Sequence, residues 1–373
     1  MIHRPFPLIA LLSAILASAS CSRAGPGSDH ASPPDGVLRF KTLQVMDRPD
    51  MIGGEAASML IPAGWAGEGT VFWRLHPTMP AGLQVRLRNP GGPEAFEAWP
   101  AQPYSWGGML AMTGFPEGSN YLGNEVRPPP AHVFDYIERY VLPQVRAGVP
   151  FRVVDRVEMP ELAEAVRAQN AGGGNFLPTE ISAGRVRIGY ELEGKPVEED
   201  FYGTLNKTFL PAGNMVFWIA DQLGAMRAEA GKLDDQAKIL QTIVASIRIH
   251  PPWLNRYQQL VEALTAYQNR QIANAGVISR IISQTNEEIT ESRRQAYEHH
   301  QAAMDRINDS YSQYIRGVDE YRNPDTGTHV ELPSGYSHAW RGRNDEYIVT
   351  DSALFNPNEE LDGSWTRLER AAD

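Results

Sequence analysis

The chain has 373 residues, of which 45 are acidic and 34 basic, and its formal net charge is −11 at pH 7. Such an acidic chain is a poor candidate for nucleic-acid binding, because affinity for the phosphate backbone comes from basic side chains. A single cysteine excludes a disulfide framework within the chain and a zinc site built from several thiolates.

The first twenty residues have the layout of a secretory signal peptide. Arg4 precedes an apolar run over residues 6–17, and small residues follow this run. A positive region, an apolar core and a small-residue cleavage site are the three parts of such a signal. The run is too short for a membrane-spanning helix, which needs about 20 apolar residues. We therefore expect residues 1–20 to direct export and to be removed.

The single cysteine, Cys21, directly follows Ser18, Ala19 and Ser20. This arrangement resembles the processing site of bacterial lipoproteins, although that family usually has leucine where Ser18 stands. The resemblance implies that Cys21 becomes the diacylated N-terminus of a membrane-anchored lipoprotein facing the periplasm or the cell surface. The alternative is ordinary cleavage after Ala17-Ser18-Ala19, which would leave Cys21 as a free thiol.

A free thiol in an oxidising compartment tends to pair between molecules, and acylation removes that hazard. We therefore predict that Cys21 is the lipid anchor. Residues 21–36 are rich in proline, glycine and serine and show no periodicity, which is typical of a flexible tether.

Residues 37–250 combine strand and helix patterns. Apolar and polar residues alternate over 83–88 and over 186–192, where Glu193-Gly194 follows as a hairpin turn, and a continuous apolar run covers 215–220. Helical patterns follow Pro128-Pro129-Pro130, begin again at Pro160 and cover 233–247. These patterns predict an α+β fold, in which helices sandwich an antiparallel sheet.

The segments SMLIPAGW and LQTIVASIRI of this region resemble domains of the PsbP/Mog1 type. The resemblance covers residues 37–250 in the order of their elements. It implies a compact α/β/α sandwich around an antiparallel sheet, of a kind that bacterial lipoproteins carry, with an insertion around residues 90–130. It implies no catalytic motif.

Residues 251–321 have the pattern of a long amphipathic helix or a helical hairpin. No proline interrupts the segment after Pro252, and apolar side chains recur at alternating spacings of four and three residues. The first members of this stripe are Trp253, Tyr257, Leu260, Leu264 and Tyr267. We expect a coiled-coil-like helix that packs on itself, associates with a second copy or binds an envelope protein, and both the straight and the hairpin forms remain open.

Residues 322–373 are predicted to form a small β meander. Its strands lie over 330–332, 336–340 and 346–350, between turn signals. This tail resembles one found in uncharacterised bacterial proteins, a likeness that implies no function. Alternation places Tyr336, His338 and Trp340 on one face, with Tyr347 from the next strand, as a candidate binding face for peptides or sugar rings. The alternative is that these side chains pack on the long helix.

No pattern predicts a catalytic residue, a cofactor or a metal site. Gly172-Gly173-Gly174 lacks the lysine and hydroxyl residue of a phosphate-binding loop. Ser337 and His338 are adjacent in a strand and point to opposite faces, and His299 and His300 are adjacent on the predicted helix, where they cannot bind one metal ion together. The acidic residues between 191 and 200 are interpreted as the solvated edge of a sheet.

These observations favour a lipid-anchored envelope protein that acts as a non-enzymatic binding or interaction module. Its partners would be an envelope protein or a second copy through the helix, and the membrane through the N-terminal lipid. Two alternatives remain. One is a hydrolase or small-ligand-binding domain with its site in the sandwich pocket, because such sites combine residues far apart in sequence. The other is a protein that binds cell-wall glycan through exposed aromatic side chains.

Overall fold

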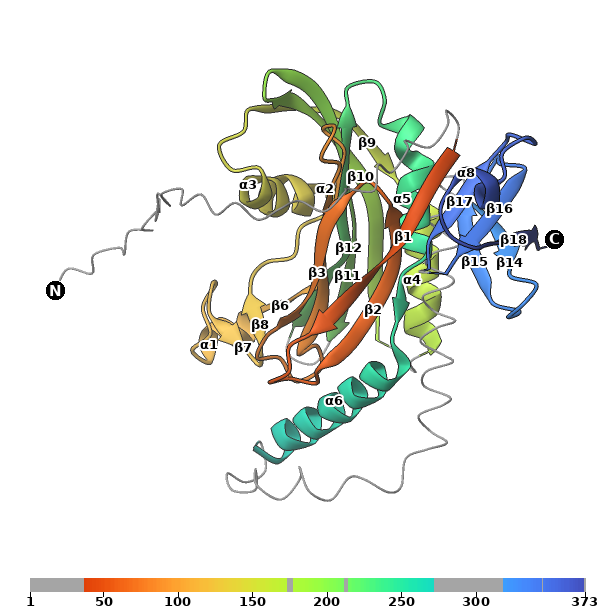
Figure 1. The fold of residues 1–373 in the computed structure, drawn as a ribbon. Helices are drawn as coiled ribbons and strands as arrows, with labels where there is room; N and C mark the ends of the chain where they lie inside the picture. The colour runs from red at the N-terminus through yellow and green to blue at the C-terminus, as the bar shows by residue number, and fades with distance from the viewer. Residues whose placement is uncertain (1–36, 173–176, 211–213, 272–317, 344, 372–373) are drawn as a thin grey trace, which may run out of the picture. The chain divides into compact units, whose positions relative to one another are not determined.

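The computed structural model describes residues 37–172, 177–210, 214–271, 318–343 and 345–371 (Figure 1). Within these ranges the chain is a mixed α+β structure in which several helices surround a large sheet, as the sequence predicted. The signal peptide, Cys21, the tether and residues 272–317, which include His299 and His300, lie outside the described residues. The predicted domain boundaries remain predictions.

The first thirteen strands of the described residues form most of the large sheet, and strands of the C-terminal tail extend it. The thirteen are β1 (Val37–Asp47), β2 (Gly54–Pro62), β3 (Ala66–Trp73), β4 (Ala81–Arg88), β5 (Ala95–Trp99), β6 (Gln102–Gly107), β7 (Asn120–Tyr121), β8 (Asn124–Val126), β9 (Phe151–Glu158), β10 (Thr179–Leu192), β11 (Lys195–Leu210), β12 (Met215–Glu229) and β13 (Arg248–Ile249).

Antiparallel pairing runs in the order β9–β10–β11–β12–β5–β4–β3. A parallel bridge between Met46 and Thr70 brings β3 beside β1, and β1 pairs antiparallel with β2. The turn between β10 and β11 is Glu193-Gly194, with φ values of 51° and 77°, which is the left-handed backbone that a two-residue hairpin turn requires. The hairpin predicted there is confirmed.

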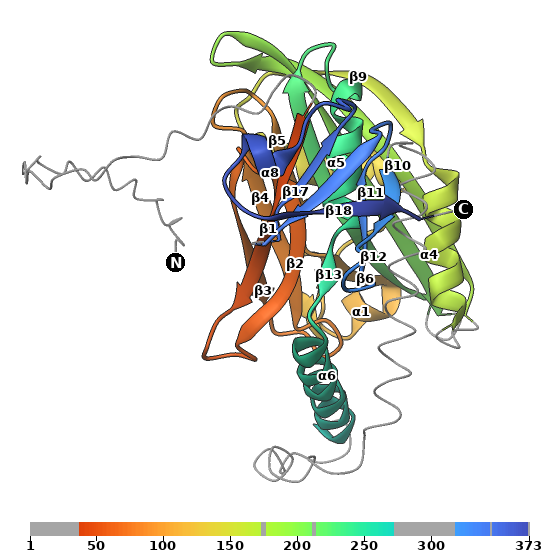
Figure 2. The same cartoon turned by 45° about the vertical axis from the view of Figure 1, so that its right-hand side comes forward.

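Helices pack on both faces of this sheet (Figures 1 and 2). The helical segments are α1 (Gly108–Met112), α2 (Val133–Tyr136), the π-helical η1 (Ile137–Val141), α3 (Leu142–Val145), α4 (Pro160–Gly172), the 3₁₀ turn η2 (Asp234–Gln236), α5 (Ala237–Ala245), α6 (Pro251–Gln271) and α8 (Pro357–Glu360). The helices predicted after Pro128-Pro129-Pro130, at Pro160 and within 233–247 are all present. Pro143 lacks the N–H that would continue a regular α-helix, which explains the π-helical stretch before it.

Strand alternation separates two apolar cores. Phe201 and Ala225 belong to the core beneath α2, η1 and α3, whereas their chain neighbours Tyr202 and Met226 belong to the core beneath α4 and α5. Successive side chains of a strand point to opposite faces, so the sheet is buried by helices from both sides. We call these two surfaces of the sheet the α2 face and the α4 face.

Helix α6 begins against the same sheet. Trp253 is buried in the core of the α4 face, where Tyr257 also packs. The buried carboxylate of Asp47 accepts hydrogen bonds from the indole N–H groups of Trp253 (2.9 Å) and Trp73 (2.8 Å), and these bonds tie α6 to β1 and β3. The first residues of the predicted coiled-coil stripe therefore pack on the sheet, and a coiled coil is not supported within the described part of the helix.

The C-terminal strands are β14 (Val318–Arg322), β15 (His329–Pro333), β16 (His338–Gly342), β17 (Tyr347–Thr350) and β18 (Trp365–Arg370). They differ from the simple meander that the sequence predicted. β17 pairs with both β16 and β1, and β18 pairs with both β16 and β14. The tail thereby continues the sheet from the first residues of β1, a long-range pairing that no local turn signal encodes.

Among the described residues, no helix is both long enough and apolar enough to cross a bilayer.

Candidate functional site

The structure does not bring the four predicted tail residues onto one face. Trp340 pairs with Ile348 and packs in a cluster with Trp365 and Phe355, whereas Tyr347 pairs with Arg341 and packs in the cluster of Phe40. Because strand residues alternate, Tyr347 and Trp340 face opposite sides of the tail. The prediction that they share a face is wrong.

The remaining two residues are held by neighbours within the fold. Tyr336 packs with Tyr347 in the cluster of Phe40, and the ammonium of Lys238 from α5 lies 5.7 Å from the centre of its ring. The guanidinium of Arg367 donates to the ring Nδ1 of His338 at 2.7 Å. The tail aromatics thus help to attach the tail to β1 and α5, and a binding role for them remains a prediction.

A different site appears on the α2 face, in the part beyond α3. Residues of β3, β4, β5 and β12 that pair across the sheet form a row there: Ala66 pairs with Arg88, Arg88 with Ala95, and Ala95 with Arg227. The neighbouring row contains Glu68, Arg86 and Glu97. Cross-strand partners point to the same side, so these charged side chains surround two alanines.

The small alanine side chains leave a depression of about 600 Å³ between the charged ones. We call it the arginine hollow. Its lining residues are Ala66, Gly67, Glu68, Arg86, Leu87, Arg88, Ala95, Glu97 and Arg227. Arg86 and Arg88 are exposed, and no carboxylate among the described residues lies within ion-pair distance of either. The guanidinium groups therefore face solvent across an uncharged floor.

A buried hydrogen-bonded network borders the hollow. Arg146, at the end of α3, donates to Glu199 from Nε (2.8 Å) and to Glu97 from Nη2 (2.8 Å), and it forms an ion pair with each. Glu199 is 1% exposed and also accepts a hydrogen bond from the Tyr190 hydroxyl at 2.8 Å. Arg227 donates from Nη1 to the same hydroxyl at 3.3 Å. The network joins the covered part of the α2 face to the hollow.

The network fixes the protonation of its members. Burial alone would lower the pKa of Arg146, but its hydrogen bonds and charge interactions with Glu199 and Glu97 outweigh that effect and raise the pKa. Burial raises the pKa of Tyr190, and the negative charge of Glu199 adds to the increase. Tyr190 therefore stays protonated at neutral pH and acts as a donor. The lining of the hollow contains three arginines, Arg86, Arg88 and Arg227, and two carboxylates, Glu68 and Glu97, so the hollow carries an excess of one positive charge.

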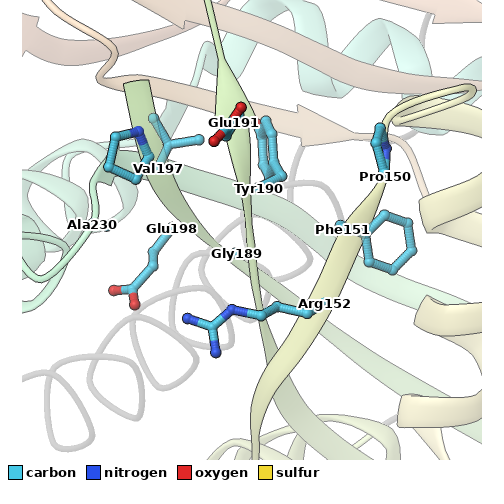
Figure 3. Close-up of a pocket in the computed structure, with 10 residues that line it drawn as sticks. Pro150, Phe151, Arg152, Gly189, Tyr190, Glu191, Val197, Glu198 and Ala230 are labelled. Carbon is cyan, nitrogen blue, oxygen red and sulfur yellow. The ribbon is translucent and has the colours of Figure 1, made fainter. Parts of the chain in front are cut away.

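A second depression, of about 480 Å³, lies on the α4 face (Figure 3). Gly189 forms its floor between Arg152 of β9 and Glu198 of β11, which are its partners across the sheet. The two charged side chains extend on either side of the glycine and balance one another. Glu191 also lines this depression, which therefore carries an excess of one negative charge and is a weaker candidate than the arginine hollow for holding an anion.

The interpretation of the acidic stretch around the β10–β11 hairpin as a solvated edge is wrong for two of its members, Glu199 and Asp200, which are buried, whereas Glu191 and Glu193 are exposed. Glu199 points to the α2 face, whereas Asp200, 3% exposed, points to the α4 face. Asp200 accepts hydrogen bonds from Arg185 (2.9 Å), Arg187 (2.7 Å) and Tyr202 (3.2 Å). Both acids lie in a central strand and are paired with arginines. No group of three or more potential metal ligands occurs among the described residues.

The sequence contained one signal of the hollow. Arg86 and Arg88 are two apart in a correctly predicted strand and therefore share its polar face. Arg227, Ala66 and Ala95 could not be added, because their positions depend on pairings between distant strands.

Comparisons with known proteins give little more. No protein-family model matches the chain, and no curated protein matches it. Among solved structures, the chain is similar to LpqN, described as involved in cell envelope biogenesis of Mycobacterium tuberculosis, with 11% identity and a TM-score of 0.21 over 57% of this chain and 92% of that one. A similarity this low carries no argument about fold or function, and the resemblance to PsbP/Mog1-type domains remains a prediction.

Proposed function

We propose that this chain is an exported, lipid-anchored binding protein of the cell envelope, and that its ligand is an anionic sugar held in the arginine hollow. The observation that carries the binding site is the row Ala66–Arg88–Ala95–Arg227, which places two guanidinium groups around a floor of alanines. The pattern around Cys21 supports the anchor, which remains a prediction.

The chemistry of the lining selects the ligand class. Arginine guanidinium groups bind carboxylate and phosphate oxygens through paired hydrogen bonds. Arg86 and Arg88 are available for this role. Within the described part of the chain, Arg227 donates from Nε to the Pro93 carbonyl and from Nη1 to Tyr190. Glu68 offers carboxylate oxygens at the rim, which accept hydrogen bonds from hydroxyl groups. A ligand with one anionic group and several hydroxyls, such as a sugar acid or a phosphosugar, satisfies both.

The same geometry favours binding over catalysis. Glu199 accepts from both Arg146 and Tyr190, and Tyr190 is itself engaged with Arg227. A general base must accept a proton from its substrate, whereas both of these side chains are already occupied by hydrogen bonds within the fold. We therefore propose a non-enzymatic role, with a protein partner or self-association through the helix after residue 251 as a further proposed activity.

Calorimetric titration of the full chain tests the proposed ligand. Glucuronate and glucose 6-phosphate are the anionic probes, and glucose is the neutral one. We expect both anions to bind and glucose to bind at least about tenfold more weakly, since a hydrogen bond to a charged group contributes roughly 1.5–3 kcal/mol. Binding should weaken as salt is added. Equal affinity for glucose and glucuronate would refute the anionic class.

A pair of matched variants locates the site. Arg88→Gln removes a hollow arginine, whereas Arg343→Gln removes an exposed arginine of the tail that has no ion-pair partner among the described residues. Both variants lower the net charge equally. We expect Arg88→Gln to weaken glucuronate binding by about tenfold and Arg343→Gln to leave it unchanged. Equal losses would mean that the overall charge matters, and the hollow would not be the site.

A further inference from the structure

Three neighbouring segments carry exposed apolar side chains at one end of the large sheet. Leu75 follows β3 and is 99% exposed, Met109 and Met112 lie in α1 and are 48% and 88% exposed, and Leu122 forms the turn between β7 and β8 and is 42% exposed. Figure 1 shows α1, β7 and β8 together at this end. We call these four residues the apolar tip. None of them belongs to the arginine hollow.

The segments of the tip are held in place by specific contacts. His76, 6% exposed, accepts backbone N–H groups of Thr78 (3.2 Å) and Met79 (2.9 Å) at Nδ1, and its Nε2 lies 3.2 Å from the Asn124 side-chain oxygen. A Cβ at Gly123 would lie only 2.8 Å from the Leu75 carbonyl oxygen. The loop after β3 therefore lies directly against the β7–β8 hairpin, and the protruding side chains belong to an ordered surface.

Leu122 is an unusual residue for its position. Its φ is 54° and that of Gly123 is 91°, so the two form a hairpin turn in the left-handed region. Asparagine, aspartate or glycine normally occupies the first position of such a turn, because a larger side chain is strained there. Leucine at this position gains no compensating burial in the core. Strained residues tend to occur where function requires a particular side chain.

The form of the tip fits a lipid surface better than a protein partner. Protein interfaces are enriched in aromatic residues, methionine and arginine around a well-packed core. Composition therefore does not decide between the two, but Leu75 and Met112 protrude almost fully exposed from separate segments and leave no packed core for a protein to complete. Residues 107–126 contain no lysine or arginine, so the segment has no basic patch to recruit anionic lipids. Apolar side chains can enter the boundary between headgroups and acyl chains by burying apolar area, without a basic patch beside them.

The length of the tether allows the tip and the anchor to meet the same membrane. The tip lies near the Asp47 end of β1, since Asp47 binds Trp73 just before the Leu75 loop, and Val37 is at the other end. Ten residue steps of strand cover about 33 Å. From Cys21 to Val37 there are sixteen steps, which reach at most about 53 Å.

We propose that the apolar tip inserts into the surface of the bilayer that carries the lipid anchor. This proposal rests on the anchor that belongs to the proposed function. A reversible second contact would hold the sheet, and with it the hollow, in one orientation relative to the membrane.

A site-specific probe tests the insertion. In the full chain with Cys21→Ala, a single cysteine replaces Leu122 and carries an environment-sensitive dye such as NBD; Leu354→Cys is the matched control. Leu354 is 93% exposed and follows β17, which pairs with β1 near Val37, far from the tip. With phosphatidylcholine vesicles, we expect a blue shift and quenching by nitroxide-labelled lipid at position 122 and neither at 354. Equal responses at both positions, or none at 122, would overturn the proposal.

A second variant keeps the test independent of the dye. Leu75→Ser with Met112→Ser alters only exposed side chains, so the fold should be retained. We expect vesicle binding of the Cys21→Ala chain to fall by at least about tenfold, because two large apolar groups no longer leave water. Unchanged vesicle binding would contradict insertion. If the double variant instead abolishes a concentration-dependent dimer in vesicle-free solution, the tip binds a second copy and the membrane proposal is wrong.

The anchor and the tip can fail separately. Mass spectrometry of the wild-type chain recovered from envelopes reports whether Cys21 is acylated. If Cys21 is acylated but the dye at position 122 shows no blue shift and no quenching, the lipid anchor is supported and insertion of the tip is refuted. If Cys21 is unmodified but nitroxide-labelled lipid quenches the dye at position 122, the lipid anchor is refuted and the tip contacts the membrane independently.

Discussion

The α2 face contains charged residues in two settings that differ only in what covers them. Beneath the end of α3, Glu199 is buried and engaged by Arg146 and Tyr190. A few strands away on the same face, Arg86 and Arg88 have no covering helix and no carboxylate partner among the described residues. A buried charge must be paired to be tolerated, whereas an exposed one remains free to bind a ligand. The comparison thus separates residues that stabilise the fold from residues available for function.

The largest expected effect is loss of the buried acid. Glu199→Ala leaves Arg146 buried without its main partner and removes the acceptor of the Tyr190 hydroxyl. Removing one partner of a buried ion pair typically costs about 3–5 kcal/mol. We therefore expect a fall of that size in the free energy of unfolding, measured by urea denaturation. Glu68→Gln, an exposed acid of the hollow, serves as the control and should change stability by less than about 0.5 kcal/mol.

If Glu199→Ala lowers the free energy of unfolding by less than about 1 kcal/mol, the proposed difference between the covered and uncovered parts of the α2 face is wrong. Such a small decrease would mean that water or side-chain movement readily compensates Arg146, and that the covered and uncovered parts of the face are equivalent.

The two settings also differ in how far the sequence could predict them. The strand over 83–88 and the hairpin at Glu193-Gly194 follow from local alternation and turn chemistry, and the structure contains both. The pairing of Arg146 with Glu199 joins residues 53 positions apart, and the acidic residues therefore looked like a solvated edge. The same limit applies to Tyr347 and Trp340, whose faces depend on the register between two strands.

The next prediction concerns high pH. In the covered part, Tyr136 is 3% exposed and its hydroxyl lies 3.0 Å from that of Tyr104. Burial raises the pKa of both tyrosines, and the Tyr104 side chain raises that of Tyr136 further. The folded state therefore retains protons that the unfolded state loses above pH 10. The free energy of unfolding should be unaffected below that pH and fall above it by up to about 1.4 kcal/mol per pH unit for each tyrosine.

Urea denaturation between pH 8 and 11 measures this slope, and Tyr136→Phe should make it shallower by about one tyrosine's share. An unchanged slope in Tyr136→Phe would mean that Tyr136 ionises in the folded protein as readily as in the unfolded one.

A smaller effect on stability is expected from filling the hollow. Ala66 is half-buried in its floor, and Ala66→Leu places three further carbon atoms between Arg88 and the neighbouring strand. Because the site is open, the free energy of unfolding should change by less than about 1 kcal/mol. Glucuronate affinity, measured by calorimetry, should fall by at least about tenfold because the added side chain occupies the ligand's volume. Retained affinity with an unchanged fold would place the ligand elsewhere.

The smallest expected effect on stability comes from the hollow arginines themselves. Arg88 makes no ion pair among the described residues, and two other arginines line the same depression. Arg88→Gln therefore removes like-charge repulsion and no hydrogen bond that the fold uses, so the free energy of unfolding should stay within about 0.5 kcal/mol of wild type or rise slightly. Urea denaturation at low salt gives the most sensitive measurement, because screening hides such repulsion at high salt. A loss above about 1 kcal/mol would show that Arg88 stabilises the sheet, in which case the hollow would be part of the scaffold and its positive charge would no longer indicate a ligand.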